Sequence, residues 1–414
     1  MKERAGRVEL DRMHFFLQQL GVPNGGNAKF IHVAGTNGKG STTSFTQAIA
    51  RGQGWKTGGY FSPYVYDLKE RFQIDGNYIS ENDLANFMSR ILPIARAMEN
   101  TDFGGPTEFE VKTAIGFLLW QQEQADVVAL EVGIGGRLDS TNVVRPAACI
   151  ITSIAYDHQK MLGDQLSQIA TEKAGIAKSG APLIVGNVPD EAWQAIQARA
   201  AEVGVEPWKF GRDITVKECA GSFSVSFPTG EITNLRCPLY GEMQHHNAAL
   251  AISALAAANL LPKPELVASC LASAKLPGRF QTAEHQGRTI ILDGAHNQES
   301  AKILATNLRA KFGDRKCILI SGMLGGHDPI PFYRELAAVT DELKLVDLTF
   351  RRSQHADDLL QALTQELPHI QVAESVSTAV KQACADGSDR PIVVTGSFYL
   401  LSDLNDQMPE LGLA

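Results

Sequence analysis

The sequence predicts an α/β protein of two domains, each built on a mainly parallel sheet. Its 414 residues exceed what a single hydrophobic core usually serves, so two domains are expected. Short apolar runs alternate along the chain with helical patterns, which is the order of elements in βαβ units. The runs are nearly continuous in apolar residues, as in parallel strands that are buried on both faces of their sheet.

The first domain is expected to begin with a short helix over residues 7–20 and to continue with five strands. The expected strands are residues 29–35, 57–62, 126–133, 148–156 and 182–186. From residue 208 to 240 the pattern changes. FSVSF alternates with a period of two and PTGE follows it, which predicts a small antiparallel patch. An alanine-rich helix is expected over residues 247–261.

The alternation of strands and helices resumes at Arg288 and predicts a second, smaller α/β domain. Its apolar runs are RTIILDGAHN, KCILISGML, LKLVDLTF and PIVVTGSFYL. The Pro-Gly pair near residue 277 marks the transition between the two parts of the chain. We therefore divide the chain into a domain of residues 1–285 and a domain of residues 286–414.

Composition and charge exclude several classes of function. The net charge of −8 argues against general nucleic-acid binding. No apolar run approaches the roughly 20 residues that a membrane helix needs, and the N-terminus lacks the apolar core of a signal peptide. Six scattered cysteines without CxxC spacing indicate reduced thiols and no zinc cluster. We therefore expect a cytoplasmic protein that binds neither nucleic acid nor membrane.

GTNGKGS, residues 35–41, has the composition of a phosphate-binding loop between a strand and a helix. Its glycines allow backbone N–H groups to converge on phosphate oxygens, and a helix that starts near Ser41 adds the positive end of its dipole. Lys39 adds a point charge, and Ser41 or Thr42 offers a hydroxyl. The spacing departs from the standard Gly-x-x-x-x-Gly-Lys-Ser/Thr pattern, because Gly40 follows Lys39. A turn that merely requires glycine is the alternative, but the lysine amid glycines and hydroxyls favours nucleotide binding.

Other polar residues follow predicted strands, which is where ligands of open parallel sheets bind. Glu131 stands at a strand end beside glycines and suits a magnesium ligand; an ion pair with Arg137 is the alternative. Asp157 and His158 follow another strand, although a lone histidine there is more typical of a hydrogen-bonded loop. Six such segments follow strands and together indicate an enzyme: GTNGKGS, SPY, EVGIGGRLDS, YDH, DGAHN and TGS.

Several further residues have a structural as well as a functional interpretation. Lys173 lies on a predicted helix, where a solvated lysine is the default. Asn247, at the start of the alanine-rich helix, is by default an N-cap. Arg279 in PGRF fits either a phosphate clamp or a plain surface charge. Asp293 and His296 in DGAHN suit a ribose or base contact, with a turn and helix cap as the alternative.

With GTNGKGS, EVGIGGRLDSTN, DH…LG…EKAGI, PGRF, DGAHN and TGSFYL in this order, the chain resembles the folylpolyglutamate synthase/dihydrofolate synthase family. These enzymes are ATP-dependent amide ligases related to the Mur peptidoglycan ligases. The resemblance runs from about residue 7 to residue 403, and the family's phosphate loop carries the same extra glycine as Gly40. It implies an N-terminal P-loop ATPase domain of the Mur-ligase type and a smaller, Rossmann-like C-terminal domain.

The resemblance also implies roles for particular residues. Lys39, Lys173 and His158 would be catalytic, and Lys173 matches a lysine that becomes carbamylated in the family. The ATP-binding positions would be Thr36, Asn37, Gly38, Lys39, Gly40, Ser41, Asn247, Arg279, Asp293 and His296. The ligands of two expected magnesium ions would include Ser62, Glu131 and His158. The pterin-bearing substrate would meet Thr107, Glu108, Phe109, Glu110, Leu138, Asp139 and Ser140.

The implied activity is addition of L-glutamate to the γ-carboxyl of a reduced folate, with ATP and Mg²⁺, by a monomer. A bifunctional enzyme that also joins glutamate to dihydropteroate is the close alternative. A Mur-type peptidoglycan ligase is more distant, since those relatives place a UDP-binding domain before the P-loop and only 34 residues precede Gly35. A non-catalytic nucleotide-binding protein is the alternative from another class, and it leaves Glu131, His158 and Lys173 without a role.

Three departures from the family's pattern fall near the substrate-facing segments. SPH is often found where this chain has Ser62-Pro63-Tyr64, and DKD where it has Gly326-His327-Asp328. TEFE in place of TFFE puts the carboxylate of Glu108 where bifunctional members often carry an aromatic ring. The ATP and metal positions match the pattern, so the choice of folate substrate is what the pattern leaves open.

Overall fold

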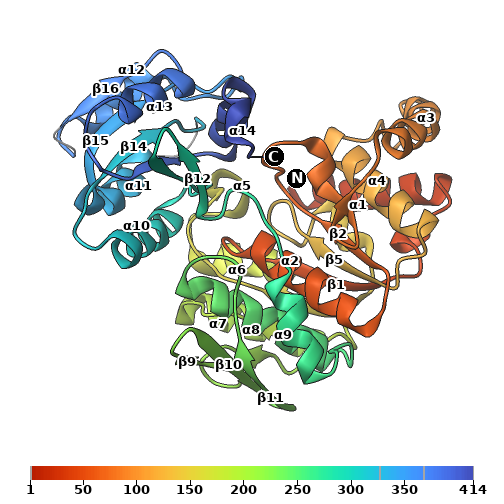
Figure 1. The fold of residues 1–414 in the computed structure, drawn as a ribbon. Helices are drawn as coiled ribbons and strands as arrows, with labels where there is room; N and C mark the ends of the chain where they lie inside the picture. Colours follow the sequence, from red (N-terminus) through yellow and green to blue (C-terminus); the bar gives the residue numbers. More distant parts are fainter. Residues whose placement is uncertain (1, 326–327, 367–368, 414) are drawn as a thin grey trace. The chain divides into compact units, whose positions relative to one another are not determined.

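The computed structural model describes residues 2–325, 328–366 and 369–413, with the backbone alone for residues 2–9. By its internal contacts the chain forms two compact units (Figure 1). Unit 1 consists of Met1–Pro63, Lys69–Pro238 and Glu242–Lys275, and unit 2 of Tyr64–Leu68, Leu239–Gly241 and Leu276–Ala414. The main division therefore falls beside the Pro-Gly pair and ahead of residue 285.

Unit 1 is built on an eight-stranded sheet in the order β4-β3-β2-β5-β1-β6-β7-β8. Its strands are β1 Lys29–Ala34, β2 Thr57–Tyr60, β3 Phe72–Ile74, β4 Asn77–Tyr78, β5 Val127–Glu131, β6 Pro146–Ile151, β7 Leu183–Val185 and β8 Trp208–Lys209. The strands from β2 to β8 in this order are parallel, and β3 and β4 form an antiparallel edge. Five of the strands are predicted from the sequence. The β3–β4 hairpin is not, because strands of three and two residues carry no periodic signal.

Three predicted strands extend too far at their carboxyl ends. The ladder stops at Tyr60, Glu131 and Ile151 rather than at residues 62, 133 and 156. One residue further on, backbone pairing still continues: Val132 N donates to Val33 O and Thr152 N donates to Ala34 O, both at 2.9 Å. The next amides of β2 and β5 bond to side chains instead: Ser62 N donates to Glu131 Oε2 at 3.0 Å, and Gly133 N donates to Asp139 Oδ2 at 3.1 Å. The residues that leave the ladder are the ones that form the loops of the candidate site.

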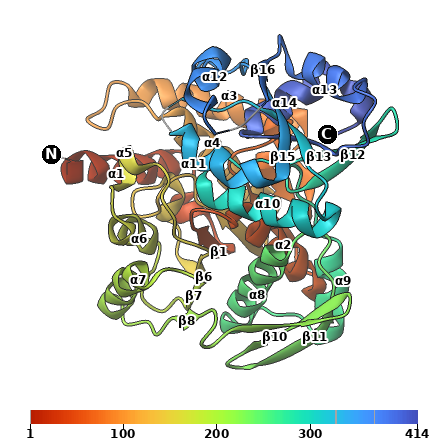
Figure 2. The same ribbon diagram turned by 90° about the vertical axis from the view of Figure 1, so that its left-hand side faces the viewer.

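The helices of unit 1 pack on its sheet, and α2 lies beside α8 (Figure 2). The helices are α1 Lys2–Gln19, α2 Lys39–Ala50, α3 Glu81–Met98, α4 Glu108–Gln122, α5 Gln159–Leu162, α6 Leu166–Ala174, α7 Asp190–Glu202, α8 Glu242–Ala257 and α9 Pro264–Ala272. A buried apolar cluster joins α6 and α7 to β6 and β7. The helix predicted over 247–261 is α8. The prediction starts too late because the first turn of α8 is polar and carries no apolar signal.

The predicted antiparallel patch is present as a three-stranded sheet in unit 1. Its strands are β9 Thr215–Cys219, β10 Ser222–Phe227 and β11 Gly230–Leu235, in the order β11-β10-β9. Phe223, Val225 and Phe227 on the central strand are buried, and the serines between them are half-buried. This is the alternation that FSVSF predicts.

Unit 2 is a six-stranded sheet in the order β12-β13-β17-β14-β15-β16, parallel except for β12. Its strands are β12 Gln281–His285, β13 Arg288–Leu292, β14 Cys317–Ser321, β15 Thr340–Leu345, β16 Ile370–Val372 and β17 Ile392–Thr395. Its helices are α10 Gln298–Phe312, α11 Pro329–Leu336, α12 Ala356–Leu363, α13 Val376–Cys384 and α14 Phe398–Gln407. The Rossmann-like C-terminal domain is thus confirmed.

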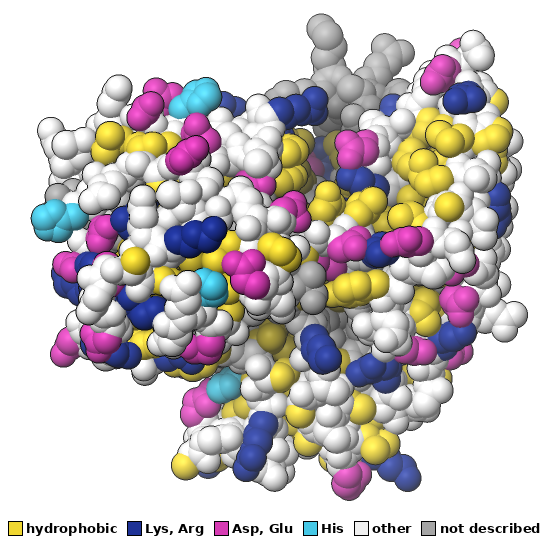
Figure 3. All heavy atoms as spheres, turned by 45° about the horizontal axis from the view of Figure 1, so that its top comes forward, with side chains coloured by type: hydrophobic (Ala, Val, Ile, Leu, Met, Phe, Trp, Pro, Cys, Tyr) yellow, Lys and Arg dark blue, Asp and Glu magenta, His cyan; other side chains and the backbone are white. Residues whose placement is uncertain are grey.

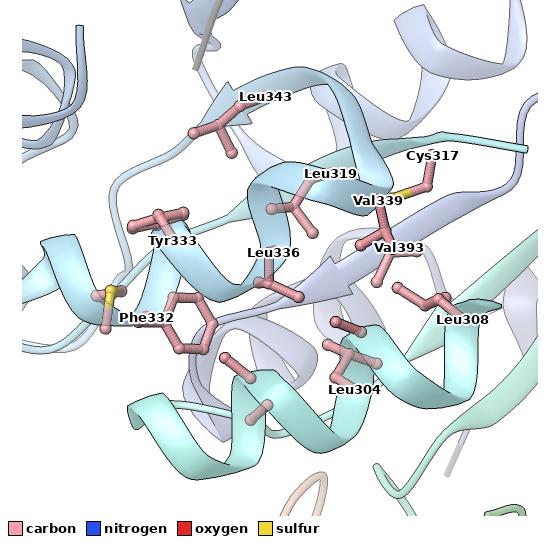
Figure 4. Packing of buried hydrophobic residues seen from close by; sticks show 14 of the residues in the cluster. Leu304, Leu308, Cys317, Leu319, Phe332, Tyr333, Leu336, Val339, Leu343 and Val393 are labelled. Carbon is pink, nitrogen blue, oxygen red and sulfur yellow. The ribbon is translucent and has the colours of Figure 1, made fainter. Parts of the chain in front are cut away.

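Apolar side chains project from both faces of the unit 2 sheet, which explains the continuous apolar runs in its sequence. On β17, Val393 packs into a cluster with residues of α10, α11 and α12, whereas Ile392 and Val394 pack into a second cluster with α13 and α14. Figure 4 shows the first cluster, in which Val393 and Leu319 lie among side chains such as Leu336. Strands covered on both faces are buried throughout, as the sequence predicts.

Acidic and basic side chains are interspersed on the face shown in Figure 3. Among the described helices, none combines the length and the apolar composition needed to cross a bilayer. Cys149, Cys219, Cys270, Cys317 and Cys384 are free thiols, and burial raises the thiol pKa of Cys149 and of Cys317 to about 12.

Candidate active site

Four neighbouring parallel strands of unit 1 end at predicted site residues. The strands β2, β5, β1 and β6 are consecutive in the sheet, so their carboxyl ends share one edge. β5 ends at Glu131, and β1 leads directly into residues 35–41. Ser62 follows β2, and His158 follows β6 at the start of α5. Candidate residues from four distant segments of the sequence thus follow strands that end at one edge of one sheet.

The loop of residues 35–41 requires glycine at two positions. Gly35 and Gly38 have φ angles of 149° and 85°. A Cβ on Gly35 would lie 1.8 Å from Thr152 Oγ1, and one on Gly38 would lie 2.5 Å from Asn247 Oδ1. Gly38 is also the N-cap of α2 and has no side chain to offer the first N–H groups of that helix. Those N–H groups and the helix dipole suit an anion.

Two hydroxyl residues at the end of β6 hold this loop, and sequence reasoning missed both. Asn37 N donates to Ser153 Oγ at 3.0 Å, and Thr152 Oγ1 donates to Asn37 O at 2.6 Å. Thr36 N donates to Ser153 O at 2.9 Å, while its hydroxyl bonds to the backbone of Ala155. The signal in the sequence was a pair of hydroxyls at a strand end next to the phosphate loop's own strand.

Asn247 lies within α8, against the phosphate loop, so its default as an N-cap is wrong. The helix begins at Glu242, and Asn247 Nδ2 donates to Gln244 Oε1 at 3.1 Å. Its side-chain oxygen lies 2.5 Å from where a Cβ on Gly38 would be. The structure therefore places this nucleotide-binding candidate beside residues 35–41, although the two are far apart in sequence.

Lys173 is buried against the phosphate loop, so the default interpretation of this residue as a solvated helix lysine is also wrong. Its side chain is on the last turn of α6, only 4% exposed, and its Nζ donates to Gly35 O at 2.9 Å. Lys39 Nζ donates to the same oxygen and to Thr36 O, each at 3.1 Å. Burial, and next the charge of Lys39, lower the pKa of Lys173 to about 7. Near neutral pH a large fraction of this amine is uncharged and nucleophilic.

The low pKa of Lys173 predicts a pH-dependent cost in stability. The pKa is about 7 in the folded chain and 10.5 in the unfolded chain, so the unfolded chain binds more protons between these values and stability rises with pH there. In CO₂-free buffer, Lys173→Met is expected to raise the unfolding free energy by roughly 2–4 kcal/mol at pH 7. The gain should shrink steadily toward pH 10. Denaturant unfolding at several pH values measures it, and a pH-independent difference would contradict the assignment.

Ser62, Glu131 and His158 offer a hydroxyl, a carboxylate and an imidazole at the same sheet edge. Glu131 is 3% exposed, and its carboxylate accepts the N–H of Ser62. Arg137 forms its ion pair with Glu172, at 2.8 Å, so the alternative of a Glu131–Arg137 pair is not what the structure has. His158 has a φ of 49°, with Nε2 3.8 Å from Asp157 Oδ1.

These donors fit a magnesium ion. Mg²⁺ usually keeps several waters and takes only one or two carboxylates from the protein. The described residues contain no group of three or more His, Cys, Asp or Glu arranged to hold a metal, so a cage made entirely of such side chains is absent from that part of the chain. One buried carboxylate with a hydroxyl and an imidazole is the kind of set that leaves room for water and phosphate oxygens.

The two candidate substrate segments, residues 107–110 and 138–140, meet at Gly133. A Cβ on Gly133 would lie 2.5 Å from Phe109 Cζ and 3.1 Å from Asp139 Oδ2. Ser140 Oγ lies 3.3 Å from Thr113 Oγ1 on α4, and Leu138 is half-buried. The segments therefore converge two residues after Glu131.

Several acidic residues of these segments already have protein partners. Glu110 forms a capping box with Thr107 and a buried ion pair with Arg12 Nε at 3.0 Å. Glu108 is exposed and pairs with Lys112 one turn along α4. Phe109 is half-buried, with its ring 6.4 Å from that of Tyr60. Phe109 is thus the member of TEFE that combines exposed area with a fixed position.

The nucleotide-binding candidates of unit 2 gather around Phe398, which sequence reasoning missed. Arg279 Cζ lies 4.3 Å from the centre of the Phe398 ring, and the ring of His296 lies 6.2 Å from it. A Cβ on Gly294 would lie 2.0 Å from Phe398 Cε1. PGRF, DGAHN and TGSF thus converge on one aromatic ring, which in the sequence looks like an ordinary core residue after a strand.

Asp293 and its neighbours are held by the backbone. Asp293 Oδ2 accepts Phe280 N and Oδ1 accepts Ala295 N, both at 2.9 Å. Burial raises the pKa of Asp293, and Arg279 acts in the opposite direction. His296 Nδ1 lies 2.8 Å from Gly294 O, so that nitrogen carries a proton.

Two of the three departures from the family's pattern fall at a boundary between the units or at a gap in the described residues. Tyr64 belongs to unit 2, whereas Ser62 belongs to unit 1. Gly326 and His327 lie outside the described residues, and Asp328 is the N-cap of α11, with Oδ1 accepting Ile330 N at 3.0 Å.

The chain matches two protein families in sequence. Residues 33–255 match the Mur ligase middle domain, and residues 278–398 match the Mur ligase glutamate ligase domain. With the strand-end site described above, these matches define the class: a two-domain ligase of the Mur type.

The relatives narrow this class to one family. The dihydrofolate synthase/folylpolyglutamate synthase of Bacillus subtilis is 33% identical over 414 residues, which cover 96% of this chain and 94% of the relative. The folylpolyglutamate synthase of Mycobacterium tuberculosis, complexed with ADP and AMPPCP, superposes with a TM-score of 0.90 at 26% identity, covering 96% of this chain and 95% of that one. The bifunctional enzyme of Yersinia pestis, complexed with AMPPNP and Mn, gives 0.87 at 32% identity, covering 97% and 93%. The chain belongs to the folylpolyglutamate synthase/dihydrofolate synthase family.

Proposed function

We propose that this chain adds L-glutamate to the γ-carboxyl of a reduced folate in an ATP-dependent reaction. The observation that carries the proposal is the sheet edge of unit 1, where a phosphate-binding loop, a buried carboxylate and a buried lysine of low pKa meet. Family membership supplies the reaction class. We further propose that the enzyme works as a cytoplasmic monomer.

The phosphates of ATP would lie over residues 36–41. Backbone N–H groups at the start of α2 would bind their oxygens, and Lys39 would neutralise charge on the γ-phosphoryl group as it transfers. Ser62, Glu131 and His158 would hold magnesium, which would offset the charge on the phosphates. Asn247 would bind another part of the nucleotide. By the family resemblance, Arg279, Asp293 and His296 in unit 2 are further candidates for nucleotide binding.

The reaction would proceed in two transfers. A carboxylate oxygen of the folate attacks the γ-phosphorus, the bond to the bridging oxygen breaks, and ADP leaves with an acyl phosphate formed. The amine of L-glutamate then attacks the acyl carbon, loses a proton, and inorganic phosphate leaves. The protein mainly holds three substrates in position and keeps water from the acyl phosphate.

Lys173 would react with CO₂ through its neutral amine. The nitrogen attacks the carbon of CO₂ and releases one proton, which converts the neutral amine into a carbamate anion. This anion would hold a second magnesium ion beside the phosphate loop. A lysine with a pKa of about 7 is suited to this chemistry, because its neutral form is abundant at physiological pH.

The bifunctional alternative is that the same site also joins glutamate to dihydropteroate. The relative from Bacillus subtilis carries both names, which favours this second activity. Phe109, half-buried where the two substrate segments meet, would contact the pterin in either case.

Incubation with ATP, Mg²⁺ and L-glutamate plus either tetrahydrofolate or dihydropteroate tests the proposal. We expect glutamate-dependent ADP release with tetrahydrofolate. Product from dihydropteroate as well would establish the bifunctional alternative. Binding of ATP without glutamate-dependent ADP release for either pterin would show a non-catalytic nucleotide-binding protein instead.

Phe398 should matter for nucleotide binding through Arg279. Phe398→Leu removes the ring face on which the guanidinium lies and is expected to raise KM for ATP by about 3- to 10-fold, the range of a partly desolvated cation–π contact. Phe398→Tyr keeps the ring face and serves as the matched control. Steady-state kinetics at varied ATP distinguish the two, and equal KM values for the Leu and Tyr variants would contradict this role.

A further inference from the structure

His32 is a fully buried histidine in the strand that leads to the phosphate loop. It stands on β1 among apolar residues, and its register partners are Leu130 on β5 and Cys149 on β6. Its Nε2 lies 2.9 Å from Thr141 Oγ1. Its Nδ1 has no hydrogen-bond partner among the described residues. A buried nitrogen without a hydrogen bond lowers the free energy of unfolding by about 1–3 kcal/mol, and an apolar side chain at this position would not have this effect.

The hydrogen-bond directions around Thr141 determine the tautomer of His32. Thr141 has one hydroxyl proton, and it donates this proton to Asp139 Oδ1 at 2.6 Å. The threonine oxygen must therefore accept the hydrogen bond from the imidazole, so Nε2 carries the proton and Nδ1 carries the lone pair. Burial, and next the charge of Lys178, lower the pKa of His32 to about 3, so the ring is neutral at physiological pH.

Asp139 connects Thr141 to the loop after Glu131 by hydrogen bonds. Its Oδ1 also accepts Thr141 N at 3.0 Å, and its Oδ2 accepts both Gly133 N and Ile134 N at 3.1 Å. All four donors come from the protein: three are backbone amides and one is the Thr141 hydroxyl, so both carboxylate oxygens are engaged. The two amides that it holds begin two residues after Glu131.

We infer that His32 is a positioning residue, which through Thr141 and Asp139 fixes the Gly133–Ile134 turn that follows the metal-ligand candidate Glu131. The inference deepens the proposed function, since it is Glu131 that would hold magnesium there. Among the described residues, Thr141 is the one hydrogen-bond partner of the imidazole, through Nε2–H. This bond explains why a costly side chain stands at an otherwise apolar strand position.

Replacement by amides separates this role from simple core packing. A glutamine places its amide nitrogen near the position of the imidazole Nε2, whereas an asparagine reaches only as far as Nδ1. His32→Gln should therefore restore the donor, and His32→Asn and His32→Leu should not. Thr141→Val removes the hydroxyl with little change in shape, and Thr141→Ser keeps it as the matched control.

Hydrogen exchange at the Gly133 and Ile134 amides is the direct readout and needs no substrate. His32→Asn, His32→Leu and Thr141→Val should each speed their exchange by about 10-fold or more, because the carboxylate that protects them becomes mobile. His32→Gln and Thr141→Ser should stay within about 3-fold of the parent chain. Amides of the unit 2 sheet should not change in any variant. Unchanged Gly133 and Ile134 exchange in Thr141→Val would overturn the inference.

The unmodified chain offers a second test, which holds even if a His32 variant does not fold. Nitrogen-15 NMR of the labelled imidazole should show the Nε2–H tautomer at pH 7 and no titration down to about pH 4. An Nδ1–H tautomer or a charged ring would overturn the inference.

A kinetic comparison tests whether the hydrogen bonds from His32 through Thr141 to Asp139 matter for the proposed function. His32→Asn should raise the Mg²⁺ concentration for half-maximal activity more than His32→Gln does. Equal Mg²⁺ requirements, with exchange altered as expected, would overturn the link to Glu131. If the parent chain has no ligase activity, the proposed function fails, while the exchange and NMR results still decide whether His32 fixes the turn.

Discussion

Lys39→Met is expected to lower kcat/KM for the ligation reaction by about 10³-fold, the scale of losing a preorganised group that stabilises transition-state charge. Lys39 stands at the first residue of α2, and its Nζ lies over the loop at 3.1 Å from Gly35 O and Thr36 O. Methionine keeps the length of the side chain and removes the charge. The loss should fall mainly on kcat, because the charge acts on the phosphoryl group during transfer.

Lys29→Met is the matched control for this prediction. Lys29 is an exposed lysine at the first residue of β1, the end of that strand opposite to residues 35–41, so the same substitution is made away from the site. Its kinetics should match those of the parent enzyme. A loss below about 10-fold in Lys39→Met, with unchanged folding, would mean that this lysine does not meet the transferred phosphoryl group.

Lys173→Met is expected to lower kcat by about 10²- to 10³-fold while making the folded chain more stable. The substitution removes the amine that would be carbamylated, and with it the anion that would hold the second magnesium ion. Lys173→Arg should not restore activity, because a guanidinium stays charged and does not form a carbamate. Loss of activity together with a gain in stability separates a functional role from a structural one.

The dependence on CO₂ identifies the modification itself. Carbon-13 NMR of the enzyme equilibrated with ¹³CO₂ should show a carbamate resonance that is absent from Lys173→Met. Activity of the parent enzyme should fall in CO₂-depleted buffer and return with bicarbonate. A resonance shared by both proteins, or full activity without CO₂, would contradict carbamylation at Lys173.

The strand-end rule accounts for what the sequence predicts well. Glu131, His158 and residues 35–41 follow apolar runs of a parallel sheet, and runs of this kind place their carboxyl ends on one edge. The strand order β2-β5-β1-β6 makes these neighbours, and that order depends on tertiary packing rather than on local pattern. The positions of these residues after strands were therefore predictable from the sequence, whereas the adjacency of the strands was not.

Burial at single positions is what local sequence could not predict. Lys173 lies in a polar helical pattern that is typical of a solvated face, and it is buried because the end of α6 packs against the phosphate loop. Phe398 looks like an ordinary core residue, and its role depends on three loops that meet only in the folded unit. Asp139, a substrate-contact candidate by resemblance, has both oxygens engaged by protein donors.

Transfer of oxygen-18 from the folate to phosphate tests the central claim most directly, that ATP activates a carboxylate at this sheet edge. A reduced folate labelled with ¹⁸O in its γ-carboxyl is incubated with the enzyme, ATP, Mg²⁺ and L-glutamate, and the released phosphate is examined by mass spectrometry. An acyl phosphate intermediate predicts one ¹⁸O atom in inorganic phosphate for each amide bond formed. Unlabelled phosphate alongside amide product, or label in AMP, would contradict the account.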